Sequence, residues 1–287
     1  METGPGGGLT PMSRITLLTD FGTRDGYVGA VKGVISSIFP GVLLDDISHD
    51  LDRGDIHGAS LALERYWNRF PRGTVHLAVV DPGVGTERRA LAVEVERRFL
   101  VVPDNGLATP ILASGLTWRA VELEPGAYLK PPESRTFHGR DLFAPAAAYL
   151  ARGIHLSRLG SAVSDPVLLP QPSVRREAEG VVGEVIVRDR FGNLVTNLDG
   201  GLLDGASEVE IAGRRIPVHQ TYGEVEPGEL LALANSDRRV EVAARDDSAA
   251  RLLDVEEGVS VRISVRSQAS PGLHPTAPSG PFDDRGP

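Results

Sequence analysis

A carboxylate and a guanidinium lie seven residues apart in a loop between two apolar runs. Asp81 follows the run that ends at Val80, and a second run, Leu91–Val95, begins just beyond Arg88. Because a short loop of proline and glycine joins the runs, the pattern predicts two neighbouring strands with Arg88 beside Asp81. An ion pair held at strand ends can bind a small polar reactant. The alternative is a surface ion pair that only closes a hairpin.

A histidine occupies the glycine-flanked loop Thr136–Asp141. An exposed imidazole at His138 can act as an acid, a base or a hydrogen-bond donor near neutral pH. The alternative is a loop histidine whose ring bonds only to the backbone.

Three aspartates directly follow apolar runs: Asp20, Asp81 and Asp104. In a parallel sheet the carboxyl ends of the strands meet at one edge, and ligands bind there. We therefore expect these carboxylates to converge at that edge. A single aspartate of this kind would be only a turn former or a helix cap.

Two polar segments in the second half of the chain offer further ligand contacts. The turn 189–197 presents the acceptor Asp189 and the amide Asn193, although Gly192 followed by Asn193 is also an ordinary hairpin pair. Ser236 lies in a small polar segment after the apolar run 230–233.

Apolar runs alternate with helical patterns from residue 14 to about residue 159. Asp55 and Asp141 are expected to cap helices. The alternation predicts an α/β domain, in which helices flank a mostly parallel sheet. After residue 180, short apolar runs separated by turn signals predict a small all-β, barrel-like domain. The expected boundaries are a disordered leader (1–12), the α/β domain (13–163), a proline-rich linker (164–179), the β domain (180–266) and a disordered tail (267–287).

Composition excludes several classes of function. The 287 residues carry a formal net charge of -9 and no cysteine. The acidic balance argues against nucleic-acid and membrane partners. The lack of thiols excludes disulfides, thiolate catalysis and thiolate metal sites. No apolar run approaches the ~20 residues that span a bilayer. Since the first residues do not form a secretory signal, we expect a cytoplasmic protein.

A metal site is an alternative chemistry. Candidate ligands for a dinuclear centre are Asp20, Asp45, Asp46, His49, Asp81, His138 and Asp141. They form no short motif with ligand spacing, and Arg88 would repel a cation bound at Asp81. The loop 81–85 also lacks the glycine pattern and the following helix of a dinucleotide site. We therefore expect neither a metal nor a cofactor.

Six segments, taken in order, resemble one family. They are Thr19–Gly22, Asp46–His49, Val80–Gly85, Pro103–Gly106, Thr136–Asp141 and Asp189–Asn193. Together they resemble the adenosine-forming S-adenosyl-L-methionine (SAM) hydrolases, also called SAM hydroxide adenosyltransferases, which are related to the SAM-dependent fluorinase and chlorinase. The resemblance extends from about Ile15 to Val265.

The resemblance implies a homotrimer, with SAM bound between the α/β domain of one subunit and the β domain of its neighbour. It implies catalytic roles for Asp81, Arg88 and His138, with Arg89 as the alternative arginine. The implied substrate contacts are Asp20 with the ribose diol, Asn193 with adenine, Asp189 and Ser236 with the methionine moiety, and Tyr27 and Ala244 as lining of the nucleoside pocket.

The expected reaction is hydrolysis of SAM to adenosine and L-methionine, by attack of water or hydroxide on ribose C5′. The related halogenases carry tyrosine and threonine where this chain has Asp81 and Val84. A carboxylate at position 81 repels halide and accepts a hydrogen bond from water, which favours hydrolysis. The alternatives are a SAM-dependent halogenase and a non-catalytic SAM- or adenosine-binding protein.

Overall fold

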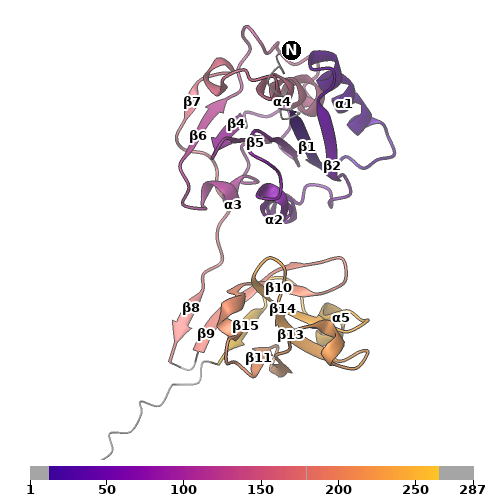
Figure 1. Cartoon of the computed structure of the whole chain (residues 1–287), viewed down its shortest axis with the longest axis vertical. Coiled ribbons are helices and arrows are strands. Elements are labelled where there is room, and N and C mark those ends of the chain that lie inside the picture. The colour runs from indigo at the N-terminus through magenta and orange to yellow at the C-terminus, as the bar shows by residue number, and fades with distance from the viewer. Residues whose placement is uncertain (1–12, 179, 265–287) are drawn as a thin grey trace, which may run out of the picture. The chain divides into compact units, whose positions relative to one another are not determined.

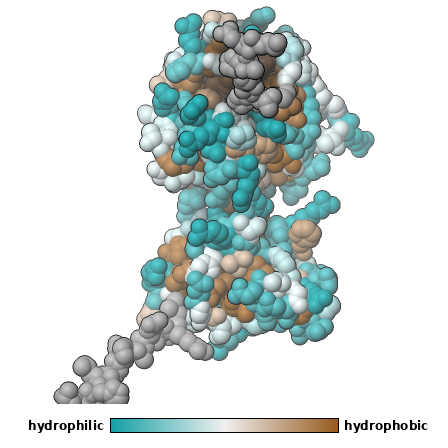
Figure 2. Space-filling model, viewed as in Figure 1, coloured by the Kyte–Doolittle hydropathy of each residue, from teal (hydrophilic) through white to brown (hydrophobic). Residues whose placement is uncertain are grey.

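The computed structural model describes residues 13–178 and 180–264, and the expected leader (1–12) and tail (267–287) lie outside them. The chain divides into two compact units, with the boundary between Gln171 and Pro172 (Figure 1). Within the described residues, no helix combines the length and the apolar character needed to cross a membrane. Figure 2 shows hydrophilic residues over much of the visible face of each unit.

The first unit is built on a seven-stranded mixed sheet with the order β2-β1-β3-β5-β4-β6-β7. The strands are β1 (Arg14–Thr19), β2 (Leu43–Ser48), β3 (Val75–Val79), β4 (Ala90–Val95), β5 (Arg98–Pro103), β6 (Trp118–Glu122) and β7 (Ala162–Val163). Strands β2, β1, β3 and β5 are parallel, whereas β4 is antiparallel to β5 and to β6, and β6 to β7.

The expectation of a mostly parallel sheet therefore holds for only part of it. The reason lies in a tight turn between β4 and β5. Glu96 and Arg97 both have positive φ, 48° and 64°, which is the backbone of a two-residue hairpin turn. Neither residue is a glycine or asparagine, so the usual sequence signal of such a turn is missing.

The expected pairing of the runs before Asp81 and after Arg88 is wrong. Strand β5 lies between β3 and β4 and pairs with both. The loop 80–89 therefore spans the carboxyl end of β5, where Ala90 of β4 pairs with Pro103. The chain still returns to the same edge of the sheet, so Arg88 remains close to Asp81.

Helices cover both faces of this sheet (Figure 1). Residues of α1 (Tyr27–Ile38) and α4 (Ala144–Ala151) share one apolar core with alternate residues of β3. Residues of α2 (Ile56–Trp67) and α3 (Thr109–Leu112) share a second core with Ala78 of β3. Because the central strands are buried on both faces, their sequences are mostly apolar, and Thr16 of β1 and His76 of β3 are buried polar exceptions.

The two expected helix caps differ in outcome. The Asp55 side chain accepts a hydrogen bond of 2.8 Å from Gly58 N and caps α2 as predicted. Asp141 does not cap a helix. It lies inside the π-helical turn Gly139–Phe143, and its carboxylate accepts hydrogen bonds from Ser134 N and from Arg140.

The second unit is a nearly closed antiparallel sheet that resembles a barrel, as the sequence predicts. Its path is β12-β11-β15-β9-β10-β14-β13, and β8 pairs with β9 beside this path. The bridge between Val218 and Ala232 brings the two ends of the path together. The strands are β8 (Arg175–Glu177), β9 (Gly180–Arg188), β10 (Leu194–Asp199), β11 (Glu208–Ile211), β12 (Arg214–Pro217), β13 (Leu230–Ala234), β14 (Arg239–Ala244) and β15 (Ser260–Ile263), with the short helix α5 (Ala249–Leu253).

Candidate active site

Asp81 and Arg88 form a buried ion pair at the carboxyl edge of the first sheet. Arg88 Nε donates to Asp81 Oδ1 at 2.9 Å and to Oδ2 at 3.1 Å, and Arg88 Nη2 donates to Oδ2. Their side chains are 5% (Asp81) and 10% (Arg88) exposed. The guanidinium also lies over the Phe143 ring, 5.2 Å from its centre. Such burial and bidentate geometry exceed what an incidental surface ion pair shows.

Arg88 also holds His138. Its Nη2 lies 3.1 Å from His138 Nδ1. A guanidinium only donates hydrogen bonds, so Nδ1 is the acceptor and the neutral ring carries its proton on Nε2. Burial lowers the pKa of His138, and the charge of Arg88 lowers it further, against the opposing effects of Asp81 and Asp141. His138 is therefore a neutral imidazole near pH 7.

Two glycines let the loop after Asp81 close on the segment before His138. Gly85 has φ +79°, and a Cβ there would lie 2.6 Å from the Arg135 carbonyl oxygen. A Cβ on Gly83 would lie 3.3 Å from Arg88 Cγ. Side chains at these positions would push the loop off the segment or displace the arginine.

Asp20 lies close to the same loop. Its Oδ2 accepts a hydrogen bond of 2.9 Å from Gly54 N, and a Cβ on Gly54 would lie 3.8 Å from Pro82 Cβ. The next residue, Phe21, packs against Gly139, whose Cβ would lie 3.0 Å from the Phe21 ring. The end of β1 therefore meets both the Asp81 loop and the His138 loop.

Tyr27 stands beside this cluster at the start of α1. Its ring packs edge-on against Phe137, with ring centres 5.2 Å apart, and against Phe21 at 6.5 Å. Half of the Tyr27 side chain remains exposed. The structure thus brings together Asp20, Tyr27, Asp81, Arg88 and His138 on the first unit.

Arg89 and Asp104 belong to a different network. Arg89 Nε donates to Asp104 Oδ2 at 2.7 Å, and its Nη1 donates to Asp165 at 2.8 Å. The other Asp104 oxygen accepts from Val167 N at 2.7 Å. Asp104 therefore lies at the end of β5 as expected, but it anchors the segment 165–167. Of the two adjacent arginines, Arg88 is the one that contacts Asp81 and His138.

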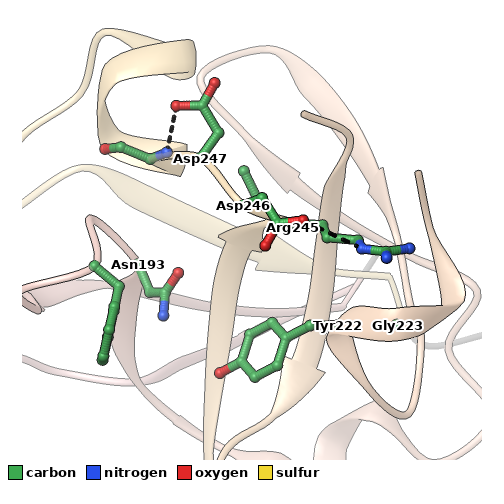
Figure 3. A pocket seen from close by; sticks show the side chains of 9 residues that line it. Asn193, Tyr222, Gly223, Arg245, Asp246 and Asp247 are labelled. Carbon is green, nitrogen blue, oxygen red and sulfur yellow. Dashed lines mark hydrogen bonds and ion pairs between the residues drawn. The ribbon is translucent and has the colours of Figure 1, made fainter. Parts of the chain in front are cut away.

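The second unit contains a pocket of about 680 Å³ (Figure 3). Two expected site residues, Asn193 and Ala244, line it. Its other lining residues, Phe191, Tyr222, Gly223 and the segment 245–248, were not expected from the sequence. The available signal was an aromatic residue in a polar turn, and in the structure Phe191 is 77% exposed.

Asp189 shapes the loop below this pocket. Its Oδ1 accepts from the backbone N–H groups of Phe191 (2.8 Å) and Asn193 (2.9 Å), and its Oδ2 accepts from Asn193 Nδ2 at 3.1 Å. The carboxylate therefore fixes the positions of Phe191 and Asn193. The turn is a hairpin loop that also carries pocket residues, and its contacts with a ligand stay a prediction.

Ser236 lies apart from the pocket lining, in the tight turn between β13 and β14. A buried carboxylate connects that turn to the pocket wall. Tyr222 Oη donates to Glu241 Oε1 at 2.7 Å, and Asn235 Nδ2 donates to Glu241 Oε2 at 3.1 Å. Burial and the Glu241 hydrogen bond raise the pKa of Tyr222, which keeps the phenol protonated.

Several of the candidate metal ligands pair with cations of the protein. Asp45 pairs with Arg14, Asp46 with Lys32 and Asp141 with Arg140. Within residues 13–178 and 180–264, no group of three His, Asp or Glu side chains is arranged to hold a metal.

Comparisons with known proteins agree with the motifs. The chain matches the SAM hydroxide adenosyltransferase N-terminal domain over residues 15–160 and the C-terminal domain over residues 183–262. An (R)-S-adenosyl-L-methionine hydrolase from Salinispora tropica is 41% identical over 262 residues, which cover 90% of this chain and 100% of the relative. A fluorinase from Actinoplanes sp. is 28% identical over 64% of this chain and 71% of its own length.

A solved structure also matches. An uncharacterized conserved protein from Thermotoga maritima superposes with a TM-score of 0.81 at 35% identity, covering 88% of this chain and 100% of that one. Both domain matches and the identity over most of the chain confirm the resemblance: the chain belongs to the SAM hydroxide adenosyltransferase family.

Proposed function

We propose that the protein hydrolyses SAM to adenosine and L-methionine, with water or hydroxide attacking ribose C5′. The C5′–O bond forms as the C5′–S bond breaks, and a water nucleophile releases one proton to the solvent. The observation that carries this proposal is the Arg88 guanidinium bonded to both Asp81 and His138, in a chain similar to a SAM hydrolase over most of its length. The sulfonium leaves as a neutral thioether, so the leaving group requires no general acid. The site has only to align and activate the nucleophile.

In this proposal the three residues share that task. Arg88 keeps its proton and stabilises hydroxide character on the nucleophile. Asp81, which pairs with Arg88, orients the water by accepting a hydrogen bond from it. His138 uses Nδ1 for Arg88, which leaves its Nε2–H to donate to the nucleophile oxygen. Alignment behind C5′ can lower the barrier by up to ~7–11 kcal/mol.

The substrate contacts follow the two groups of residues. Asp20 holds the ribose diol and Tyr27 lines the nucleoside site on the first unit. On the second unit, Asn193, Phe191 and Tyr222 offer one amide and two rings to adenine, which suits a flat heteroaromatic base. Asp189 Oδ2 keeps one lone pair for the methionine amino group after bonding Asn193. Ser236 completes the methionine contacts, and Ala244 lines the nucleoside pocket.

The assembly and conditions of the reaction are part of the proposal. Two groups of substrate contacts on separate units suit a homotrimer in which neighbouring subunits complete each site. The reaction uses no metal and no cofactor, because SAM itself carries the leaving group. The location is cytoplasmic. A chelator that leaves the rate unchanged would support the metal-free reaction.

Halogenation is the second candidate, since a fluorinase is among the relatives. The buried Asp81 carboxylate disfavours it because a halide at that place would meet a negative charge. A non-catalytic SAM-binding role is disfavoured by the Asp81–Arg88–His138 arrangement, which a binding protein would not need.

Product analysis in ¹⁸O-labelled water tests these candidates together. The chain is incubated with SAM, with and without chloride, and the products are identified by mass spectrometry. We expect adenosine labelled at the 5′-oxygen, in equal amount with methionine. 5′-Chloro-5′-deoxyadenosine would show a halogenase, and intact SAM after hours would show a binding protein.

A further inference from the structure

We propose that His49 is a positioning residue that fixes the turn Thr19–Gly22, which carries Asp20, for binding of the ribose diol. This inference deepens the proposed function and rests on it. Asp46–His49 is one of the motifs found in the sequence, and neither the alternative of a metal site nor the catalytic group explains it.

His49 holds the turn Thr19–Gly22 at both ends. Its Nδ1 lies 2.8 Å from Thr19 Oγ1, and its backbone carbonyl accepts a hydrogen bond of 2.8 Å from Gly22 N. Inside the turn, Phe21 N donates to Thr19 Oγ1 at 3.3 Å. Asp20 lies between these fixed points, so its backbone direction is set by the contacts of His49.

A bulge in β2 places His49 there. Leu17 pairs with Asp46, but Leu18 pairs with Ser48, so Ile47 is an extra residue on β2. Continuing the shifted register puts His49 opposite Thr19. Without the extra residue, Ser48 would take that position and its short side chain would face Thr19 instead.

The orientation of the imidazole is fixed from its other side. His49 Nε2 lies 3.0 Å from Asp46 Oδ1, and Asp46 Oδ2 accepts from Lys32 Nζ at 2.6 Å. Burial raises the pKa of Asp46, but the hydrogen bonds from Lys32 and His49 outweigh it, and the pKa lies below the usual value. The Asp46 carboxylate therefore accepts a hydrogen bond from His49 Nε2–H.

This proton position decides the role of Thr19. With Nε2 protonated, Nδ1 is the acceptor, so the Thr19 hydroxyl donates to it and accepts from Phe21 N. Each donor in this series of contacts then faces an acceptor. A carboxylate, a histidine and a hydroxyl in line resemble a nucleophile triad, but Thr19 is 1% exposed and its oxygen is occupied by Phe21 N. The arrangement positions a turn and does not present a nucleophile.

The same turn reaches the catalytic group. Asp20 bonds Gly54 N beside Pro82, and Phe21 packs on Gly139 beside His138. A turn released from His49 would move Asp20 away from the diol more than it would affect recognition of adenine by the second unit. The expected signature is therefore a selective loss of diol recognition.

The test compares binding of adenosine and 2′-deoxyadenosine to the full chain by calorimetry. We expect the wild type to prefer adenosine. His49→Leu should reduce the ratio of the two affinities about tenfold, which corresponds to the loss of one hydrogen bond. His49→Asn should reduce the ratio by about twofold at most, because Asn Oδ1 replaces the Nδ1 acceptor. Thr19→Val should give the same loss, and the double variant no additional loss.

The chain provides a matched control on the same strand. Thr16 Oγ1 lies 2.8 Å from His76 Nδ1, a buried threonine–histidine pair like that of Thr19 and His49 but inside β1 rather than at its end. Thr16→Val should lower stability without changing the affinity ratio. If it changes the ratio as much as Thr19→Val does, general destabilisation explains the effect and the proposal is wrong.

Two outcomes separate this proposal from the proposed function. A wild type that distinguishes the nucleosides, with His49→Leu and Thr19→Val variants that do so equally well, overturns the positioning role alone. A wild type that binds neither nucleoside, or both equally, overturns the diol contact of Asp20 and the positioning role with it. Amide hydrogen exchange gives a readout without ligand: Phe21 N–H should exchange faster in Thr19→Val, and unchanged exchange also overturns the proposal.

Discussion

Arg88 donates a hydrogen bond to His138 Nδ1 across 3.1 Å while it holds Asp81 with the same guanidinium. The arginine therefore pairs with the Asp81 carboxylate and makes the neutral tautomer of His138 the one with Nε2–H. In a reaction whose leaving group is already a cation, such a site supplies alignment and positive charge to the nucleophile, and no strong base.

Removing the charge of Asp81 should slow turnover and spare binding. Asp81→Asn keeps the shape but removes the charge that pairs with Arg88 and replaces one acceptor oxygen with an NH2 group, so the water is oriented less well. We expect turnover to fall about 10²–10⁴-fold, the range of one acid–base or orienting group, with SAM affinity within a few-fold of wild type. Adenosine release measures the turnover, and calorimetry measures the SAM affinity. Glu87→Gln, an exposed carboxylate of the same loop, is the control and should behave as wild type. Equal turnover in both variants would contradict the role of Asp81.

The activity should depend on pH through His138. Its pKa is lowered, first by burial and then by Arg88, so the ring stays neutral to a lower pH than an ordinary histidine with pKa 6.5. Protonation would remove the Nδ1 acceptor and place a cation beside Arg88. We expect the acidic limb of kcat/KM to have its midpoint below pH 6.5. His138→Asn should lose turnover and this acidic limb together. An acidic limb that persists in the variant would assign it to another group.

A methyl group on Gly85 should damage the site through the loop alone. Gly85→Ala introduces a Cβ 2.6 Å from Arg135 O, in addition to the strain of φ +79°. Gly115 has the same φ of +79° with no atom within 4 Å of its Cβ position, so Gly115→Ala measures the strain by itself. We expect about 1 kcal/mol of destabilisation from strain in both, and a further loss, with reduced turnover, in Gly85→Ala only. Thermal unfolding and adenosine release would show this. Two variants with equal stability and equal turnover would exclude the contact as the reason for glycine at position 85.

The ion pair of Asp81 and Arg88 was predictable from spacing, although the expected route to it was wrong. A hairpin and the observed insertion of β5 both return the chain to one edge of the sheet, so the pair forms either way. The insertion depends on a turn at Glu96 and Arg97, which lacks the glycine that normally reveals such a turn. Local spacing could therefore predict the contact but not the strand order.

The choice between Arg88 and Arg89, and the pocket of the second unit, could not be predicted for a related reason. Adjacent residues entering β4 point to different partners, and only the three-dimensional position of Asp165 shows where Arg89 goes. The pocket takes its lining from the turn at 191–193, the segment 222–223 and the segment 244–248, which only the barrel brings together. The polar turn indicated Asn193 and the resemblance implied Ala244, but neither pointed to Tyr222.

The hydroxyl and the ring of Tyr222 should be separable by mutation. Tyr222→Phe removes a donor to the buried Glu241 and should lower the free energy of unfolding by about 1–3 kcal/mol, while the ring keeps its place in the pocket wall. Tyr222→Ala removes both and should also weaken adenosine binding. Denaturant unfolding and calorimetry measure the two effects. If Tyr222→Phe weakens adenosine binding as much as Tyr222→Ala does, the hydroxyl or its effect on Glu241 is needed for binding. Stacking on the ring then does not account for the adenosine affinity.

His76 should make the folded state sensitive to acid. It is fully buried, and this burial, with a smaller effect of Arg98, lowers its pKa to about 3. The unfolded chain, with an ordinary pKa near 6.5, therefore binds more protons between pH 6.5 and 3. The free energy of unfolding must then fall as the pH decreases through this window, by up to about 1.4 kcal/mol per pH unit.

Denaturant unfolding of the wild type and of His76→Asn between pH 7 and pH 4 measures this dependence. The variant loses its titrating group, so its stability should change less with pH, even if it is less stable at pH 7. His155→Asn, at an exposed histidine, is the control and should keep the wild-type slope. If His76→Asn keeps that slope as well, the acid sensitivity comes from the carboxylates. The buried imidazole then contributes little, because the folded state rearranges locally and lets His76 take up a proton.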